Sequence, residues 1–128
     1  MTPKKKVAPA EGAERRRYKR YDVKLHADVT TEDAFLFAYV SNISEVGIFL
    51  ATDKPLAVGT LMKLRFRPLE SESFEVEGEV VWVNPVRQKP EENINPGMGI
   101  KFVNLDDATR DRIVKLIRTI AYLHDNWV

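Results

Sequence analysis

Residues 40–50 read VSNISEVGIFL, and this stretch decides how the chain is expected to fold. Apolar residues lie on both sides of a short polar break that holds Asn42, Ser44 and Gly47. Asn and Ser bend a chain by hydrogen-bonding nearby backbone amides, and Gly permits a positive φ or the close approach of another group. The pattern predicts either an ordinary turn between two strands or a concave polar ledge that holds a ligand.

An arginine cluster upstream favours the ligand-binding ledge. Arg15, Arg16, Arg17 and Arg20 precede the first apolar segment of the chain. The guanidinium group is suited to planar, bidentate recognition of phosphate or of the O6/N7 edge of guanine. Several such groups on an arm could close over a ligand that offers both, and the polar break would supply the floor.

The charge distribution separates a basic start from an acidic body. The chain has 128 residues, which fits one domain plus a tail. Residues 1–20 sum to +6, so the remainder sums to −5 within a net charge of +1. We expect residues 1–13 to form a disordered basic tail and residues 14–125 to form the domain. A basic arm on an acidic body indicates an anionic partner at the arm.

Several classes of function lack their sequence signatures. The absence of cysteine excludes disulfides and thiolate zinc sites. His26 and His124 have no second ligand at metal-binding spacing and are interpreted as structural. The glycines form neither a dinucleotide-binding motif nor a P-loop. We therefore expect that the protein is not an enzyme and that it binds neither a metal nor a cofactor. No apolar segment reaches the roughly 20 residues of a membrane span, and no secretory signal begins the chain, so the expected location is the cytoplasm.

Six strand-like segments precede one amphipathic helix. The strands are predicted at residues 23–29, 35–41, 48–51, 62–66, 74–82 and 98–103. Asp106 or Asp107 is expected to cap the helix, whose apolar stripe runs from Ile113 to Leu123. The pattern predicts a small six-stranded antiparallel β-barrel with a C-terminal α-helix packed on it.

For two of the predicted strands, the sequence also indicates which side chains are buried. The apolar run 35–41 is typical of a strand that is buried on both faces. In the segment 74–82, strict alternation places Trp82 on the same face as Phe74, and Gly78 is expected to mark a bulge or bend.

Two spaced motifs resemble the PilZ domain of bacteria. R-x-x-x-R is formed by Arg16 and Arg20, and [D/N]-x-S-x-x-G is formed by Asn42, Ser44 and Gly47. The resemblance covers about residues 14–123. NPGMGIKF at residues 95–102 and VVWV at residues 80–83 also resemble a subgroup common in gliding delta-type bacteria. The family is a six-stranded antiparallel barrel with a C-terminal helix, and many members bind the second messenger cyclic di-GMP.

The resemblance assigns roles by position. The implied ligand-binding residues are Arg16, Arg20, Asn42, Ser44 and Gly47, with Arg15 and Arg17 as helpers. The two motif arginines would grip guanine and phosphate, while the second motif would cradle the other side of the guanine. Arg15, directly before the first motif, would influence whether one or two ligand molecules stack.

The sequence departs from the family pattern at two positions, which keeps alternatives open. Asn42 stands where Asp is common and lacks the carboxylate charge that favours guanine N–H donors. Val46 stands where a small residue is usual, which stiffens the turn.

The resemblance implies a cyclic di-GMP receptor whose arm orders on binding and which regulates motility or surface polysaccharide through protein contacts. The alternatives are a protein-interaction domain of the same fold that binds no nucleotide, and a barrel that binds single-stranded nucleic acid. The acidic body argues against nucleic acid, and the sequence identifies neither the downstream protein partner nor the oligomeric state.

Overall fold

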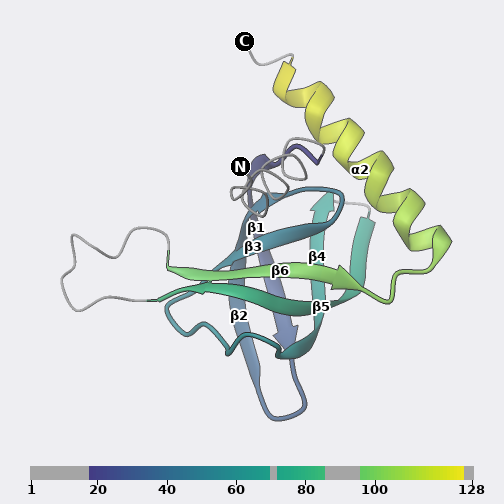
Figure 1. Cartoon of the computed structure of the whole chain (residues 1–128). Coiled ribbons are helices and arrows are strands. Elements are labelled where there is room, and N and C mark those ends of the chain that lie inside the picture. The colour runs from purple at the N-terminus through teal and green to yellow at the C-terminus, as the bar shows by residue number, and fades with distance from the viewer. Residues whose placement is uncertain (1–17, 70–71, 86–95, 126–128) are drawn as a thin grey trace, which may run out of the picture.

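The structure is a computed structural model that describes residues 18–69, 72–85 and 96–125 (Figure 1). The predicted tail 1–13, the arginines Arg15, Arg16 and Arg17, and residues 86–95 lie outside the described residues. The elements are β1 (Tyr21–Thr30), β2 (Phe35–Ile43), β3 (Gly47–Ala51), β4 (Leu61–Leu69), β5 (Glu72–Asn84), β6 (Gly97–Val103) and α2 (Asp107–Asp125).

The six strands form a closed antiparallel barrel in the order β1-β2-β3-β6-β5-β4, which confirms the predicted architecture. Alternate residues of each strand point inward because successive side chains of a strand face opposite ways. The interior includes Val29, Val40, Leu64, Val80 and Ile100, all at most 2% exposed. Burial of these aliphatic side chains supplies the main favourable term in folding.

Helix α2 covers one end of the barrel, and the β1–β2 turn lies at the opposite end (Figure 1). The apolar stripe of α2 is buried in the same core as the strands and consists of Ile113, Leu116, Ile117 and Ile120. Arg112 fixes the first half of the helix, because its guanidinium lies 4.3 Å from the ring centroid of Phe74 and donates to the Ser73 carbonyl at 3.1 Å. The helix therefore closes the barrel end at which β1 starts.

The N-terminus of α2 is capped by Asp106. The Thr109 amide donates to Asp106 Oδ1 at 2.7 Å, which satisfies one of the donors left open at a helix start. This backbone hydrogen bond, together with one from the Thr109 side chain, holds the pKa of the Asp106 carboxyl below its ordinary value. Of the two predicted candidates, Asp106 is thus the capping residue.

The expectation that β2 is buried on both faces is wrong. Ala38 and Val40 point into the core, but Phe35, Phe37 and Tyr39 on the other face are 57%, 71% and 43% exposed. A barrel strand has one inner and one outer face, so an apolar run of this kind must place half of its side chains outside. The outer face of β2 is therefore aromatic and open.

The expected irregularity in β5 lies at a different residue. The register against β6 shifts between Val80 and Trp82, whereas Gly78 pairs regularly with Phe102. A Cβ at residue 78 would collide with the side chain of Ile100, so Gly78 makes room for a core residue. The shift turns Trp82 outward, where it is 51% exposed, instead of placing it on the same face as Phe74.

Candidate functional site

The candidate site is built around the turn between β2 and β3. β2 continues to Ile43, which is buried and pairs with Ile48, so Asn42 belongs to the strand and not to the predicted break. The register shifts between Val40 and Asn42, which makes Ser41 an extra residue of the kind found in a β-bulge. Bulges bend a strand and re-aim its side chains, so this one helps to set the direction of Asn42.

Ser44 shapes the turn from within. Its side chain is fully buried, and its Oγ accepts a hydrogen bond from the Val46 amide at 3.2 Å. Its own amide donates to the Gly47 carbonyl at 2.9 Å, and its Oγ donates to the same carbonyl at 3.4 Å. Hydroxyl-to-backbone bonds of this type substitute for regular strand pairing where a chain reverses. Ser44 is therefore a structural part of the ledge.

Gly47 is required by the barrel. A Cβ at this position would collide with the backbone carbonyl of Ile100 on β6, which pairs directly beside it. Gly47 is not among the described glycines with positive φ, so close approach, and not left-handed geometry, explains the glycine. Of the two reasons predicted for a glycine here, the structure supports close approach. The contact holds the ledge tightly against β6.

Arg20 joins the two sequence motifs. Its Nε donates to Asn42 Oδ1 at 2.8 Å, across a separation of 22 residues. Its Nη1 lies 3.5 Å from Ser44 Oγ, at the long limit for a hydrogen bond. The neutral amide of Asn42 thus accepts a hydrogen bond from a guanidinium. An aspartate at this position would accept the same bond and add a negative charge. Arg15, Arg16 and Arg17 belong to the segment that the structure does not describe.

The strand register places an aromatic surface beside the ledge. One row across the barrel runs from Asp22 on β1 through Asn42, Phe49 and Gly99 to Trp82 on β5. The rings of Phe49 and Trp82 lie 5.3 Å apart between centroids and are tilted by 32°. The indole lies over Gly99, where a Cβ would overlap it. The outer wall beyond Asn42 therefore holds the buried ring of Phe49, packed against the half-exposed indole of Trp82.

Sequence reasoning missed Trp82 because it extended the alternation of β5 through the bulge. The warning signal was the continuous apolar run at residues 80–83, which cannot alternate. A second signal was Gly97 and Gly99 in the adjoining strand, because glycines leave space for a large side chain on a neighbour. Both signals together would have indicated an outward indole over a glycine-lined strand.

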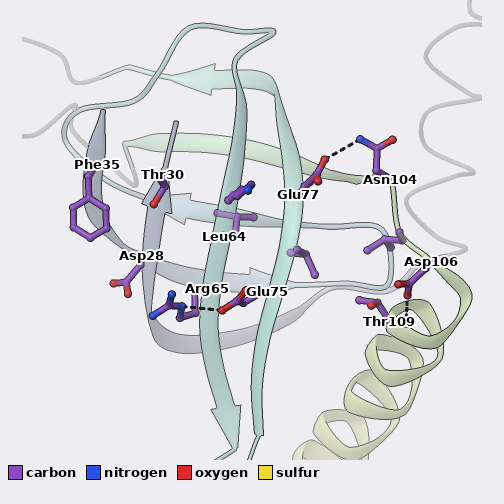
Figure 2. Close-up of a pocket in the computed structure, with 13 residues that line it drawn as sticks. Asp28, Thr30, Phe35, Leu64, Arg65, Glu75, Glu77, Asn104, Asp106 and Thr109 are labelled. Atoms are coloured by element: carbon purple, nitrogen blue, oxygen red, sulfur yellow. Dashed lines mark hydrogen bonds and ion pairs between the residues drawn. The ribbon is translucent and has the colours of Figure 1, made fainter. Parts of the chain in front are cut away.

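A separate cleft lies on the outside of the barrel, between β1, β4, β5 and the start of α2, and several charged side chains line it (Figure 2). Its volume is about 560 Å³, and neither Arg20 nor the second motif lines it. Its polar groups bond to one another: Arg65 Nε lies 3.3 Å from Glu75 Oε2, and Asn104 donates to Glu77 Oε1 at 2.9 Å. These contacts give the cleft residues a structural role.

The described part of the chain carries neither a metal centre nor a membrane-spanning helix. Within residues 18–69, 72–85 and 96–125, no group of three or more His, Asp or Glu side chains is placed to hold a metal ion. His26 lies on the outer face of β1 with its ring 4.6 Å from that of Tyr39. No helix in the described ranges combines the length and the apolar character needed to cross a bilayer.

The fold is shared with several solved structures. The PilZ domain of YcgR from Escherichia coli, solved with cyclic di-GMP, is 17% identical with a TM-score of 0.70, covering 88% of this chain and 95% of that one. The PilZ domain of CeSA from a cellulose-synthesizing bacterium is 11% identical with a TM-score of 0.62, covering 80% and 98%. The inhibitor of motility MotI/DgrA from Bacillus subtilis is 24% identical with a TM-score of 0.59, covering 82% and 51%.

A search of curated proteins found no match. The family model of the PilZ domain, however, matches residues 14–119, which include both spaced motifs and every strand of the barrel. Its span also agrees with the six-stranded topology and the terminal helix. The chain therefore belongs to the PilZ domain family.

Proposed function

We propose that residues 14–125 act as a cytoplasmic receptor module for cyclic di-GMP. The observation that carries the proposal is the contact of Arg20 with Asn42 and Ser44, which brings the two motifs to one place on the barrel rim. Membership of the PilZ family supports this choice of ligand, as does the similar fold of the YcgR PilZ domain, which was solved with cyclic di-GMP. The module acts by binding and not by catalysis, without a metal or a cofactor.

The chemistry of the ledge suits a guanine with a phosphate beside it. Arg20 offers several N–H donors, and the Oδ1 of Asn42 is an acceptor that guanine N–H groups can share. The exposed face of Trp82 lies in the same row and offers a surface on which a purine ring can stack. Arg16 would reach the phosphate from the arm. Arg15 and Arg17 would assist, and Arg15 would influence the ligand stoichiometry.

Ligand binding would order the arm against the barrel. The ledge is held by the Ser44 turn and by the contact of Gly47 with β6, so the barrel needs little adjustment. The arm residues before Tyr18 would close over the ligand through charge-assisted hydrogen bonds. The new surface would change the affinity for a downstream protein. Motility is a suitable output because a neighbouring fold, MotI/DgrA, is an inhibitor of motility, and regulation of surface polysaccharide is the other.

Titration calorimetry of the full chain with cyclic di-GMP tests the proposal, with GTP and cyclic di-AMP as controls. We expect selective binding at micromolar affinity or tighter, abolished in the double variant Arg16→Ala/Arg20→Ala. The double variant Arg110→Ala/Arg118→Ala removes the same two charges from exposed sites on α2 and is expected to bind like the wild type. No heat from folded wild-type protein at high ligand concentration would overturn the receptor function and favour the ligand-independent interaction domain.

A further inference from the structure

The outer face of the β1–β2 hairpin carries a row of exposed aromatic side chains. Phe35, Phe37 and Tyr39 follow one another on the outside of β2 and are 57%, 71% and 43% exposed. The Phe35 and Phe37 rings meet edge to face at 5.0 Å, and the Tyr39 ring lies 4.6 Å from that of His26 on β1. Such a contiguous aromatic surface on the outside of a barrel indicates an interaction site. We call these four residues the hairpin patch.

The charges around the hairpin patch change sign along the strands. The β1–β2 turn, at the barrel end opposite α2 (Figure 1), carries the exposed carboxylates of Glu32 and Asp33. At the other end of the patch, towards α2, Lys24 is exposed on the same outer side of β1 as His26. Within the hairpin, one end of the patch is therefore acidic and the other basic. Lys63 of the neighbouring β4 lies beside Thr30 at the acidic end, and Asp22 lies beyond Lys24 at the basic end.

The register defines which residues share a level of the hairpin. Thr30 pairs with Phe35, Asp28 with Phe37, and His26 with Tyr39. Phe37 thus lies in the middle of the aromatic row, between the acidic β1–β2 turn on one side and Lys24 on the side towards α2. Figure 2 shows Asp28, Thr30 and Phe35 on the two neighbouring strands of this hairpin.

We propose that the hairpin patch binds the same patch of a second copy of the chain, with the hairpins antiparallel and a two-fold axis beside Phe37. In this arrangement Phe37 meets its counterpart, and Phe35 lies against Tyr39 of the other copy. Glu32 and Asp33 then face Lys24 of the other copy, and the contact occurs twice by symmetry. The acidic end of each patch covers the basic end of its partner, which is the observation that favours a second copy over an unrelated protein.

The size of the patch fits the apolar centre of a modest dimer interface. An aromatic side chain buries about 150–250 Å² when fully covered, so three rings exposed by 57%, 71% and 43% still offer roughly 350 Å². Specific interfaces bury about 800 Å² on each partner, with an apolar core and a polar rim. The charged residues at both ends would supply the rim. Asp28 lies beside the axis, where its carboxylate approaches that of the other copy, and its register partner Arg65 on β4 forms an ion pair with Glu75.

The proposed interface is separate from the nucleotide site. The nucleotide site uses Arg20, Asn42 and Ser44 at the barrel end covered by α2, whereas the centre of the patch lies nearer the β1–β2 turn. The inference therefore does not rest on cyclic di-GMP binding.

Sedimentation equilibrium of the full chain tests the proposal. We expect a reversible monomer–dimer equilibrium, weakened by about 30-fold or more in Phe37→Ser, because truncation of a central aromatic residue removes a binding hot spot. Val58→Ser removes another apolar side chain, 62% exposed, from a loop outside the patch and is expected to leave the equilibrium unchanged. Circular dichroism checks that both variants fold. A monomeric wild type, or a dimer that Phe37→Ser leaves intact, would overturn the proposal.

A charge exchange tests the antiparallel arrangement. Lys24→Glu places a carboxylate opposite Glu32 and Asp33, and Glu32→Lys/Asp33→Lys places ammonium groups opposite Lys24. Each variant alone is expected to lose the dimer through like charges. An equimolar mixture is expected to recover a heterodimer, because both end contacts are then between opposite charges. Failure of the mixture to associate would refute the antiparallel stacking.

Discussion

Gly47→Ala should destabilise the barrel, whereas Gly99→Ala should not. The two glycines lie in paired strands, β3 and β6, and a Cβ would collide with a neighbour at either position. The neighbours differ in kind. At residue 47 the obstacle is the backbone carbonyl of Ile100, which is fixed in the sheet. At residue 99 it is the indole of Trp82, a side chain that is 51% exposed and can turn away.

The magnitudes follow from these obstacles. A methyl group forced into a packed region costs about 1–3 kcal/mol, and an obstacle that cannot move places Gly47→Ala at the upper end. Replacing Gly by Ala also lowers the entropy of the unfolded chain, which offsets about 0.4–1 kcal/mol. The net loss for Gly47→Ala is therefore about 2 kcal/mol. For Gly99→Ala the two effects nearly cancel, and the free energy of unfolding should change by less than about 1 kcal/mol.

Thermal unfolding followed by circular dichroism measures the difference. About 2 kcal/mol corresponds to a Tm lower by roughly 8–10 °C in a domain of this size, and urea unfolding provides the free energy independently. Gly99→Ala should keep its Tm but weaken cyclic di-GMP binding, since it displaces Trp82. If Gly47→Ala unfolds at the wild-type temperature and only loses ligand binding, the structural explanation of this glycine is wrong and the residue contacts the ligand.

Two further predictions concern the helix cap and the indole. The pKa of Asp106 is lowered in the folded state, so its stabilising effect should be fully present above the ordinary pKa of about 3.8 and be lost as the pH falls through the lower, folded value. Asp106→Asn should remove this part of the pH dependence, which Tm measurements between pH 2 and 6 would show, and an unchanged profile would contradict the assignment. In a Trp127→Phe background, the fluorescence of Trp82 should change and saturate as cyclic di-GMP is added; an unaltered spectrum despite calorimetric binding would exclude stacking on Trp82.

The architecture was predictable because its strongest signals are local. Alternating residues such as Met62, Leu64 and Phe66 define a strand with one buried face, and the structure buries all three. The acidic pair before Ile113 indicated a capped amphipathic helix, and Asp106 does cap it. Closure into a barrel followed from six such strands in a short chain.

The details that escaped prediction depend on the register between strands. Hydrophobicity alone could not show that Phe37 lies outside the barrel, because β2 has apolar residues at both its odd-numbered and its even-numbered positions. Alternation predicted Trp82 on the inner face, but a bulge before it reverses the side. The motif did predict that Asn42 and Ser44 belong together, while the hydrogen bond from Arg20 to Asn42 required three-dimensional geometry. A sequence pattern fixes which residues face alike within a strand, but not where pairing shifts by one residue.

The hydrogen bond between Arg20 and Asn42 makes the protein compete with its own proposed ligand. The part of this interaction that is lost when the ligand binds costs free energy, and that free energy is subtracted from the affinity. A substitution that weakens this internal bond without removing either hydrogen-bonding group would release Arg20 and tighten the complex. The order of Arg20 in the free protein and the affinity for the nucleotide are thus two measures of one thermodynamic linkage.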